Sequence, residues 1–465
     1  MEIPQMHLPP AQQSASKARK ARWQAALAAL VVVLMVAAGC SDDEPESSPA
    51  PAAEITATPA AATPTAAPTP EPAPESEPLA ASAPEVTGRL LVADGEGAMM
   101  SVVDVGTGAV AQDAFDLGSR PTRVYATKSG RFAIAVATDA NDAHVFDGGV
   151  YLEPHDDHMD LVKRDVSRLE IDLSGDRPIH LNVGKDWAGL FYDGSGNVAF
   201  IAEEGLAEEG GSYMPALINV GAHHGALVSL DNDLFAVSYR HPDYESDPQR
   251  YVLPIGAEIV NADGESLHRQ LDCEGLHGNA GNGSVAVFGC IGGAMFIEVH
   301  DDATFHSGFV SAPEGAAEDF RLGSVWGAPG LDHFLALGGA VGLWVVNPHD
   351  GAMELLIPAV EGRSAVDVNF SHDGKSFLVL MGNGELRKYD AERLTLLAAT
   401  SDFLSGPVAP DFYGRPSMVT APGAVFVTDP TGEQVLMLED EDLNVVQSWN
   451  VDGIPTKLAF VGILG

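Results

Sequence analysis

From residue 88 onward, short apolar runs alternate with turns rich in Gly, Asp, Asn and Ser, without the periodicity of long amphipathic helices. One unit recurs: a short strand, a turn, and then the apolar run that is typical of a buried strand. The turns of seven such units are 66, 36, 51, 49, 42 and 49 positions apart, and they contain Gly130, Gly196, Asn232, Gly283, Asp332, Gly374 and Gly423. A period near 49 with four short strands per unit predicts the blades of a β-propeller.

An eighth unit can be assembled from the two ends of this region. Lys457–Val461 near the C-terminus is apolar enough to pair with Leu90–Ala93, and the pairing would hide two exposed sheet edges. We therefore predict an all-β, eight-bladed β-propeller over residues 88–465, with seven blades as the alternative. The long first interval is explained by an insertion, Tyr151–Asp165.

The first 39 residues read as a signal peptide. Four basic residues, Lys17, Arg19, Lys20 and Arg22, precede an uncharged apolar stretch, Ala25–Ala38. Small residues then lead into Cys40, as in a bacterial lipobox, although Ala37 stands where Leu is usual. A plain transmembrane anchor is the alternative, but the apolar run is short for a spanning helix.

Residues 40–87 form a Pro-, Ala-, Thr-, Ser- and Glu-rich segment with almost no large apolar side chain. Such a segment cannot bury enough surface to offset the entropy of ordering, and its prolines keep it extended. We expect a disordered linker, tethered by lipid on Cys40, that holds the propeller outside the cytoplasm at the cell membrane, in the periplasm or on the cell surface.

The chain carries a formal net charge of −41. No basic patch is available to neutralise phosphates, so nucleic-acid binding is excluded as a function. The acidity could favour cations near the surface, or it could reflect only solubility or a saline habitat.

The chain has three cysteines. With Cys40 assigned to lipid, Cys273 and Cys290 remain as an even pair, which should form a disulfide in an oxidising compartment. A role for them as zinc ligands is the alternative, although no Cys-x-x-Cys spacing is present.

Histidines recur at one position in three successive units: His180 in Arg-Pro-Ile-His-Leu, His223 and His224 in Gly-Ala-His-His-Gly, and His277 in Gly-Leu-His-Gly. These positions are the starts of innermost strands, so the side chains should face one central funnel. Because successive strand side chains point to opposite faces, only one of His223 and His224 should point inward, and we favour His224. Converging imidazoles predict a site for Zn²⁺.

The insertion contributes two more candidate ligands, His155 and His158, among several carboxylates. It precedes His180 along the chain, so we expect it to fold over the same mouth and add ligands from a loop that can open. The remaining histidines are interpreted as structural, with a second surface ion at His300-Asp301-Asp302 left open as an alternative.

Several of these motifs together resemble the AztD family of periplasmic zinc metallochaperones. The matching segments are His155–His158, Arg177–His180, Phe191–Gly196, Ala222–Gly225, Asp272–Gly278 and Phe288–Cys290. The resemblance implies a propeller that carries zinc to the solute-binding protein of a zinc ABC importer. It also implies zinc held by the matched histidines, and a disulfide between Cys273 and Cys290.

We accordingly expect a non-enzymatic zinc carrier, monomeric because a closed propeller needs no partner. Two other functions remain as alternatives: a zinc-dependent propeller hydrolase or lactonase that activates water, and a non-catalytic propeller that binds a protein or glycan.

Overall fold

The computed structural model describes residues 83–464. The predicted signal peptide, Cys40 and the linker up to residue 82 lie outside the described residues, so the lipid anchor and the boundaries of these segments stay predictions. The first strand of the propeller begins at Gly88.

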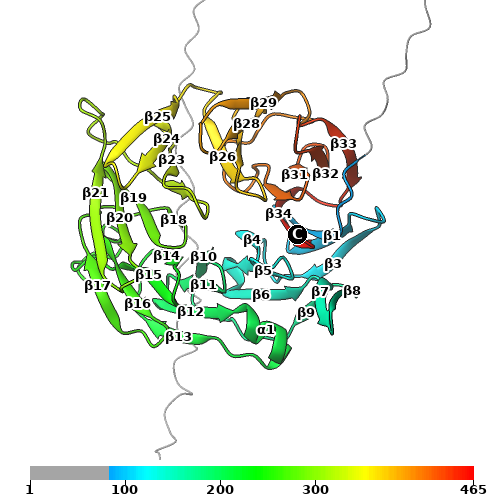
Figure 1. Ribbon diagram of the computed structural model, residues 1–465, viewed down its shortest axis with the longest axis horizontal. Helices are drawn as coiled ribbons and strands as arrows, with labels where there is room; N and C mark the ends of the chain where they lie inside the picture. Colours follow the sequence, from blue (N-terminus) through cyan, green and yellow to red (C-terminus); the bar gives the residue numbers. More distant parts are fainter. Residues whose placement is uncertain (1–82, 465) are drawn as a thin grey trace, which may run out of the picture. The chain divides into compact units, whose positions relative to one another are not determined.

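Eight four-stranded antiparallel sheets form a closed ring, which confirms the eight-bladed propeller (Figure 1). The first four blades in chain order, each from the innermost strand outward, are β34(Pro455–Gly462)-β1(Gly88–Asp94)-β2(Met99–Asp104)-β3(Val110–Asp116), β4(Arg123–Ala126)-β5(Phe132–Ala137)-β6(Asp142–Asp147)-β9(Ser167–Leu169), β10(Pro178–Val183)-β11(Trp187–Tyr192)-β12(Asn197–Ala202)-β13(Ala216–Asn219), and β14(Leu227–Ser229)-β15(Leu234–Tyr239)-β16(Gly256–Asn261)-β17(Ser266–Gln270).

The remaining four blades follow the same order. They are β18(Asn279–Gly281)-β19(Val285–Cys290)-β20(Gly293–Val299)-β21(Phe305–Ser311), β22(Ser324–Trp326)-β23(Phe334–Gly338)-β24(Gly342–Asn347)-β25(Ala352–Ile357), β26(Ala365–Phe370)-β27(Ser376–Met381)-β28(Leu386–Asp390)-β29(Leu396–Thr400), and β30(Met418–Ala421)-β31(Ala424–Asp429)-β32(Gln434–Glu439)-β33(Val445–Asn450).

The two ends of the propeller close the ring as the sequence predicts. Strand β34 pairs antiparallel with β1, with Leu90 opposite Phe460 and Val92 opposite Leu458. The innermost strand of this blade therefore comes from the C-terminus and the other three come from the N-terminal end, so β1 is paired on both sides and is not left as a free edge.

One turn lies at a different position in its blade than the repeat pattern predicts. Gly196 lies between the second and third strands, β11 and β12, whereas the other six turn residues lie between first and second strands. The innermost strand of this blade is β10, which contains His180. The uneven intervals around Gly196 thus arise from this one-strand shift together with the insertion.

The core lies between neighbouring blades. Second strands such as β5, β19, β27 and β31 are buried along their whole length. Between adjacent sheets, Phe200 stacks on Phe235 with ring centroids 3.9 Å apart. These strands are covered on both faces, which explains why they read as apolar runs without alternation.

The topology gives the ring two distinct faces. The innermost strands begin on one face, here called the mouth face, where the turns between second and third strands also lie. The turns between first and second strands and between third and fourth strands lie on the opposite face, because successive strands in each blade are antiparallel.

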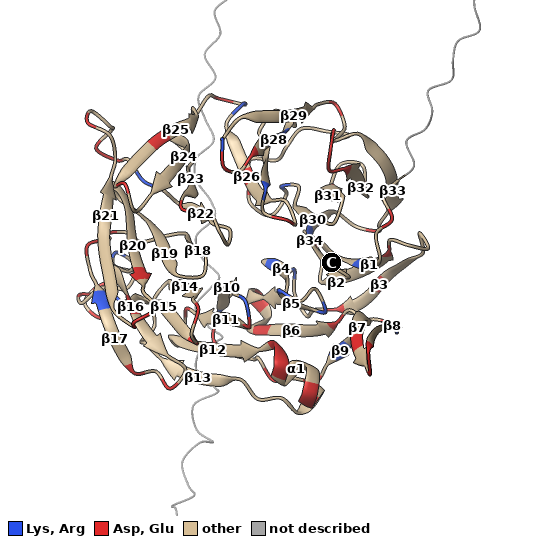
Figure 2. Ribbon diagram, viewed as in Figure 1, with Lys and Arg blue, Asp and Glu red and all other residues tan. Residues whose placement is uncertain are grey.

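Few elements depart from this plan in the described residues. They are the hairpin β7(Val150–His155)-β8(His158–Lys163), α1(Glu203–Glu209), and the 3-10 turns η1(Thr138–Ala140) and η2(Gly210–Ser212). Within residues 83–464, no helix has the length and apolarity needed to cross a membrane. Acidic residues are spread over the outer strands and connecting loops (Figure 2).

Candidate metal centre

Three histidines from consecutive blades meet at the mouth face. His180 is on β10, His224 precedes β14 by three residues, and His277 precedes β18 by two. These three strands are the innermost of their blades (Figure 1). All three side chains are partly buried, so the repeated sequence position does bring the imidazoles together.

The distances within this funnel triad, His180, His224 and His277, are short. The Nε2 atoms of His180 and His224 are 3.1 Å apart. The ring centroid of His277 lies 5.3 Å from that of His224 and 6.1 Å from that of His180. Nitrogen ligands of a tetrahedral zinc ion are roughly 3.3 Å apart. His180 and His224 already meet this spacing, and His277 must move inward to complete it.

Two of these imidazoles, those of His224 and His277, have hydrogen-bond partners at Nδ1, the ring nitrogen that points away from the centre of the triad. His224 Nδ1 lies 2.5 Å from Asp193 Oδ2, and His277 Nδ1 lies 2.7 Å from the carbonyl oxygen of Gly323. When Nδ1 donates its proton to these acceptors, Nε2 is left with a free lone pair. Such partners fix the tautomer and orientation of metal-binding histidines and raise their basicity.

Asp193 is a functional candidate that the sequence analysis did not single out. It is buried in the turn between β11 and β12, and its carboxylate also accepts the backbone N–H of Gly225. The sequence shows it within the matching segment Phe191–Gly196, but no spacing signal connects it with His224.

The neighbouring His223 has a structural role. Its Nδ1 contacts the carbonyl oxygen of Gly221 and its Nε2 contacts Ser238 Oγ, both at 2.8 Å. Both ring nitrogens are therefore occupied, and burial lowers the pKa of His223 to about 4. The inward-facing member of the pair is His224.

Burial favours the neutral form of two members of the funnel triad, His180 and His277. Burial lowers the pKa of His180 well below its ordinary value, and the neighbouring imidazoles of His224 and His277 and the charge of Arg123 lower it further. Burial also lowers the pKa of His277, although its bond to Gly323 opposes this. Neutral imidazole is the form that binds zinc, so protons compete weakly with zinc for His180 and His277.

This predicts how zinc affinity depends on pH. A lowered pKa means that the imidazole takes up its proton only below the ordinary histidine range, so affinity should be nearly constant from about pH 8 to about pH 6.5 and should fall below that. Zinc titrations against a chelator of known protonation behaviour would measure this. A steep loss of affinity already between about pH 8 and about pH 7 would contradict it.

A disulfide anchors the segment that carries His277. Cys273 and Cys290 are joined, as the sequence predicted. The intervening chain is also pinned by backbone bonds from Leu276 N–H to the Pro254 carbonyl and from His277 N–H to the Gly289 carbonyl. The third ligand of the funnel triad therefore sits beside a cross-linked loop.

We expect the double variant Cys273→Ala, Cys290→Ala to be less stable by about 3 kcal/mol, the usual contribution of a disulfide that closes a loop of this size. Zinc affinity should also fall, because the His277 segment loses its anchor. Urea denaturation at neutral pH would measure the free energy of unfolding of the double variant and of the reduced wild type, each compared with the oxidised wild type. If both were as stable as the oxidised wild type, the prediction would be contradicted.

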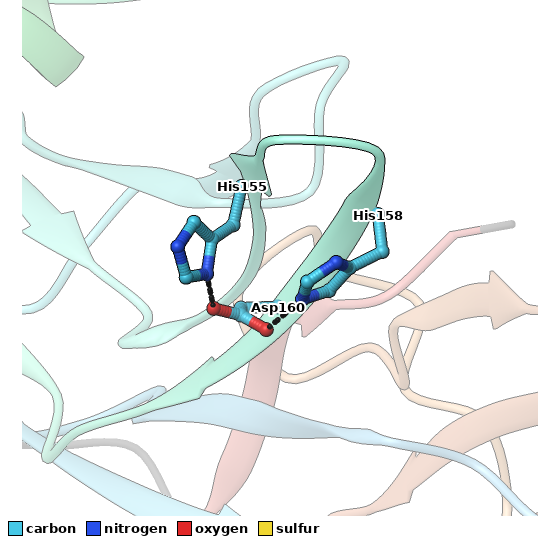
Figure 3. A group of neighbouring side chains, drawn as sticks. All are labelled: His155, His158 and Asp160. Atoms are coloured by element: carbon cyan, nitrogen blue, oxygen red, sulfur yellow. Dashed lines mark hydrogen bonds and ion pairs between the residues drawn. The ribbon is translucent and has the colours of Figure 1, made fainter.

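The insertion forms a separate, exposed group of ligands. His155 and His158 are cross-strand partners in the β7–β8 hairpin, and both point at the carboxylate of Asp160 (Figure 3). His155 Nδ1 is 2.9 Å from Asp160 Oδ2, and His158 Nε2 is 3.2 Å from Oδ1. Asp160 is thus a third candidate ligand that the sequence analysis did not name.

The expected position of this hairpin was wrong. It connects the third and fourth strands of its blade, β6 and β9, and therefore lies at the periphery on the opposite face. Its base agrees with this: Gly148 N–H bonds to the carbonyl of Arg131, which follows the turn between β4 and β5. His155 and His158 cannot share an ion with the funnel triad.

Comparison with known proteins supports the resemblance found in the motifs. The chain is 25% identical over 384 residues to the zinc chaperone AztD of Citrobacter koseri, covering 80% of this chain and 86% of that protein. The crystal structure of Citrobacter koseri AztD aligns with a TM-score of 0.69 at 23% identity, covering 81% and 98% of the two chains.

More distant similarity is confined to the fold. A dihydro-heme d1 dehydrogenase, NirN, in complex with its ligand aligns with a TM-score of 0.51 at 12% identity, covering 82% of this chain and 78% of that one. No family model matches the chain. The resemblance to AztD-type zinc chaperones is therefore confirmed by both the sequence and the fold.

Proposed function

We propose that this protein is a zinc metallochaperone that binds Zn²⁺ in the funnel triad and delivers it to the solute-binding protein of a zinc ABC importer. The observation that carries the proposal is the convergence of three imidazoles, two of which have their rear nitrogens held by Asp193 and Gly323. The similarity to a curated zinc chaperone supports the same function.

The arrangement suits a cargo that must be released. His180, His224 and His277 supply three nitrogen ligands, which leaves a fourth position of a tetrahedral ion free for water or for a ligand of the acceptor. A pocket whose lining includes His277, Asp319, Arg321 and Gly323 opens beside the third ligand of the triad. A side chain of the acceptor can therefore bind the ion before the histidines dissociate from it.

The exposed group on the β7–β8 hairpin is proposed as an additional zinc site. His155, His158 and Asp160 offer three ligand atoms that all lie within 4.8 Å of one another. Their side chains are 52–61% exposed. A site this open should bind more weakly and exchange faster than the funnel triad.

We further propose an extracytoplasmic location, with the propeller monomeric and anchored by lipid on Cys40. The disulfide between Cys273 and Cys290 supports an oxidising compartment.

A zinc hydrolase is not favoured by the geometry. The carboxylate in direct contact with the funnel triad, Asp193, is already engaged by His224 and by the backbone of Gly225, so Asp193 is not free to act as a general base. The curated relative is named as a zinc chaperone.

A transfer experiment tests delivery. Zinc-loaded protein would be mixed with the apo solute-binding protein in the presence of a chelator that captures free zinc. We expect the acceptor to fill faster than zinc appears on the chelator when the acceptor is absent, because transfer proceeds through direct contact. Equal rates, or zinc found only on the chelator, would contradict delivery.

A further inference from the structure

A carboxylate on the opposite face is surrounded by three imidazoles. Glu298, on β20, is opposite His306 of β21 in the strand register. His300 opens the turn between these strands, and His349 belongs to the corresponding turn of the next blade, after β24. The Nδ1 atoms of these three histidines lie 3.8, 3.4 and 3.9 Å from the carboxylate oxygens, in the order His300, His306 and His349.

The carboxylate stands where several other blades place an apolar side chain. A residue at the end of the third strand opens the turn by a backbone bond across it, as Asp104, Asn261, His300, Asp390 and Glu439 do. The residue two positions earlier is Val102, Ile259, Glu298, Lys388 and Met437, respectively; the three apolar ones are buried, and the buried Lys388 pairs with Asp440. The propeller repeat therefore does not require an acidic residue at this position.

The turn residue also departs from the repeat. Asp104 and Asn261 each use a side-chain oxygen to accept a backbone N–H of their own turn, from Thr107 and Glu265 respectively. An imidazole replaces this cap at His300, and its Nδ1 is directed at Glu298 instead.

Glu298 lacks a strong partner. Its side chain is only 14% exposed, and among residues 83–464 no lysine or arginine lies within 4.0 Å of its carboxylate. The imidazole distances of 3.4–3.9 Å are longer than a normal N–H···O bond. Only His306 comes within hydrogen-bonding reach of the Glu298 carboxylate, at 3.4 Å. A largely buried carboxylate with one long hydrogen bond is poorly compensated, and a bound cation would compensate it.

The ligand atoms suit a borderline divalent transition metal. One ligand atom each from Glu298, His300 and His306 lies within 4.8 Å of the other two. Two imidazoles and one carboxylate form a ligand set typical of zinc, and a mixed nitrogen and oxygen set does not suit calcium or magnesium. His349 lies outside this group of three, but its Nδ1 is 3.9 Å from the Glu298 carboxylate, and its turn is capped by Asn347.

We propose that Glu298, His300 and His306 form a second zinc-class metal site, completed by His349 across the boundary between two blades. The site is distinct from the funnel triad and from the β7–β8 hairpin, because it is built from the β20–β21 turn and its neighbour. A metal ion held there would link the two blades on the face away from the mouth.

The test uses full-length protein in which the other candidate ligands are removed by H155A, H158A, H180A, H224A and H277A. A calorimetric titration of this variant with zinc alone should show that one equivalent of zinc still binds per protein. Adding H306A and H349A, whose side chains are 58% and 43% exposed, should weaken that binding by at least about 30-fold. The matched control H372A, in the turn between β26 and β27, should leave it unchanged.

Two further measurements keep the result clear. Circular dichroism would verify that each variant is folded, and E298Q would remove the charge while keeping the shape of the side chain. Cobalt(II) in the five-alanine background should give tetrahedral absorption bands that H306A abolishes. No zinc binding in that background, or binding that H306A, H349A and E298Q leave intact, would overturn the proposal. Loss of the funnel site alone would affect the proposed function and not this one.

Discussion

The double variant His224→Ala, His277→Ala is expected to lose high-affinity zinc binding, with a drop in affinity on the order of 10³-fold, or about 4 kcal/mol. Two of the three nitrogen ligands disappear, and His180 alone cannot hold a zinc ion against water. Calorimetry with a competing chelator would measure the loss at neutral pH.

The control for this variant should remove histidines in similar number outside the triad. His268→Ala with His372→Ala is suitable, since these side chains lie in the outer strand β17 and in the turn between β26 and β27. That variant should bind zinc in the funnel like the wild type. Equal affinity of the triad variant and the wild type would exclude the funnel as the principal site.

The second large effect is expected from a residue that does not contact the ion. Asp193→Ala should weaken zinc binding by roughly 10- to 100-fold, because His224 loses the acceptor that fixes its tautomer and orientation. Asp193→Asn should have a smaller effect, since an amide oxygen can still accept the Nδ1 proton although the negative charge is gone. The same titration, run on both variants, would establish the order.

A matched carboxylate near the same blade provides the comparison. Asp172→Asn removes an exposed carboxylate that bonds only to Ser174, so it should leave zinc affinity unchanged. If Asp193→Ala also binds like the wild type, Asp193 does not position the funnel triad and the rear hydrogen bond has no functional role.

Much of the fold could be predicted because a propeller repeats one local pattern. The turn residues indicate seven of the eight blades, and the apolar ends, Leu90–Ala93 and Lys457–Val461, indicate how the ring closes. The same repetition predicts His180, His224 and His277 as ligands; His180 lies within its innermost strand, whereas His224 and His277 lie in the segments just before theirs.

The errors have a common physical origin. The pattern misplaces Gly196 because second and third strands in the blade containing β11 and β12 show the same apolar run and glycine turn as first and second strands elsewhere. The β7–β8 hairpin is wrongly expected over the mouth because its neighbour in sequence is His180. An insertion lies on the mouth face or on the opposite face according to which strand of the blade it follows. Placing it therefore requires the correct assignment of each strand to its position in the blade.

Contacts between side chains that lie far apart in the sequence could not be predicted from sequence patterns. Asp193 contacts His224 from 31 positions away, and His349 approaches Glu298 from the next blade. Neither pair has a spacing that distinguishes it from ordinary turn residues, since only the pairing of strands and the packing of blades bring such side chains together.

The most direct test of zinc binding in the funnel is anomalous diffraction at the zinc edge from crystals of the zinc-loaded protein. We predict an ion within about 2.1 Å of Nε2 of His180, His224 and His277. An ion found only at the β7–β8 hairpin or the Glu298 group, with the three funnel imidazoles free of metal, would contradict this prediction.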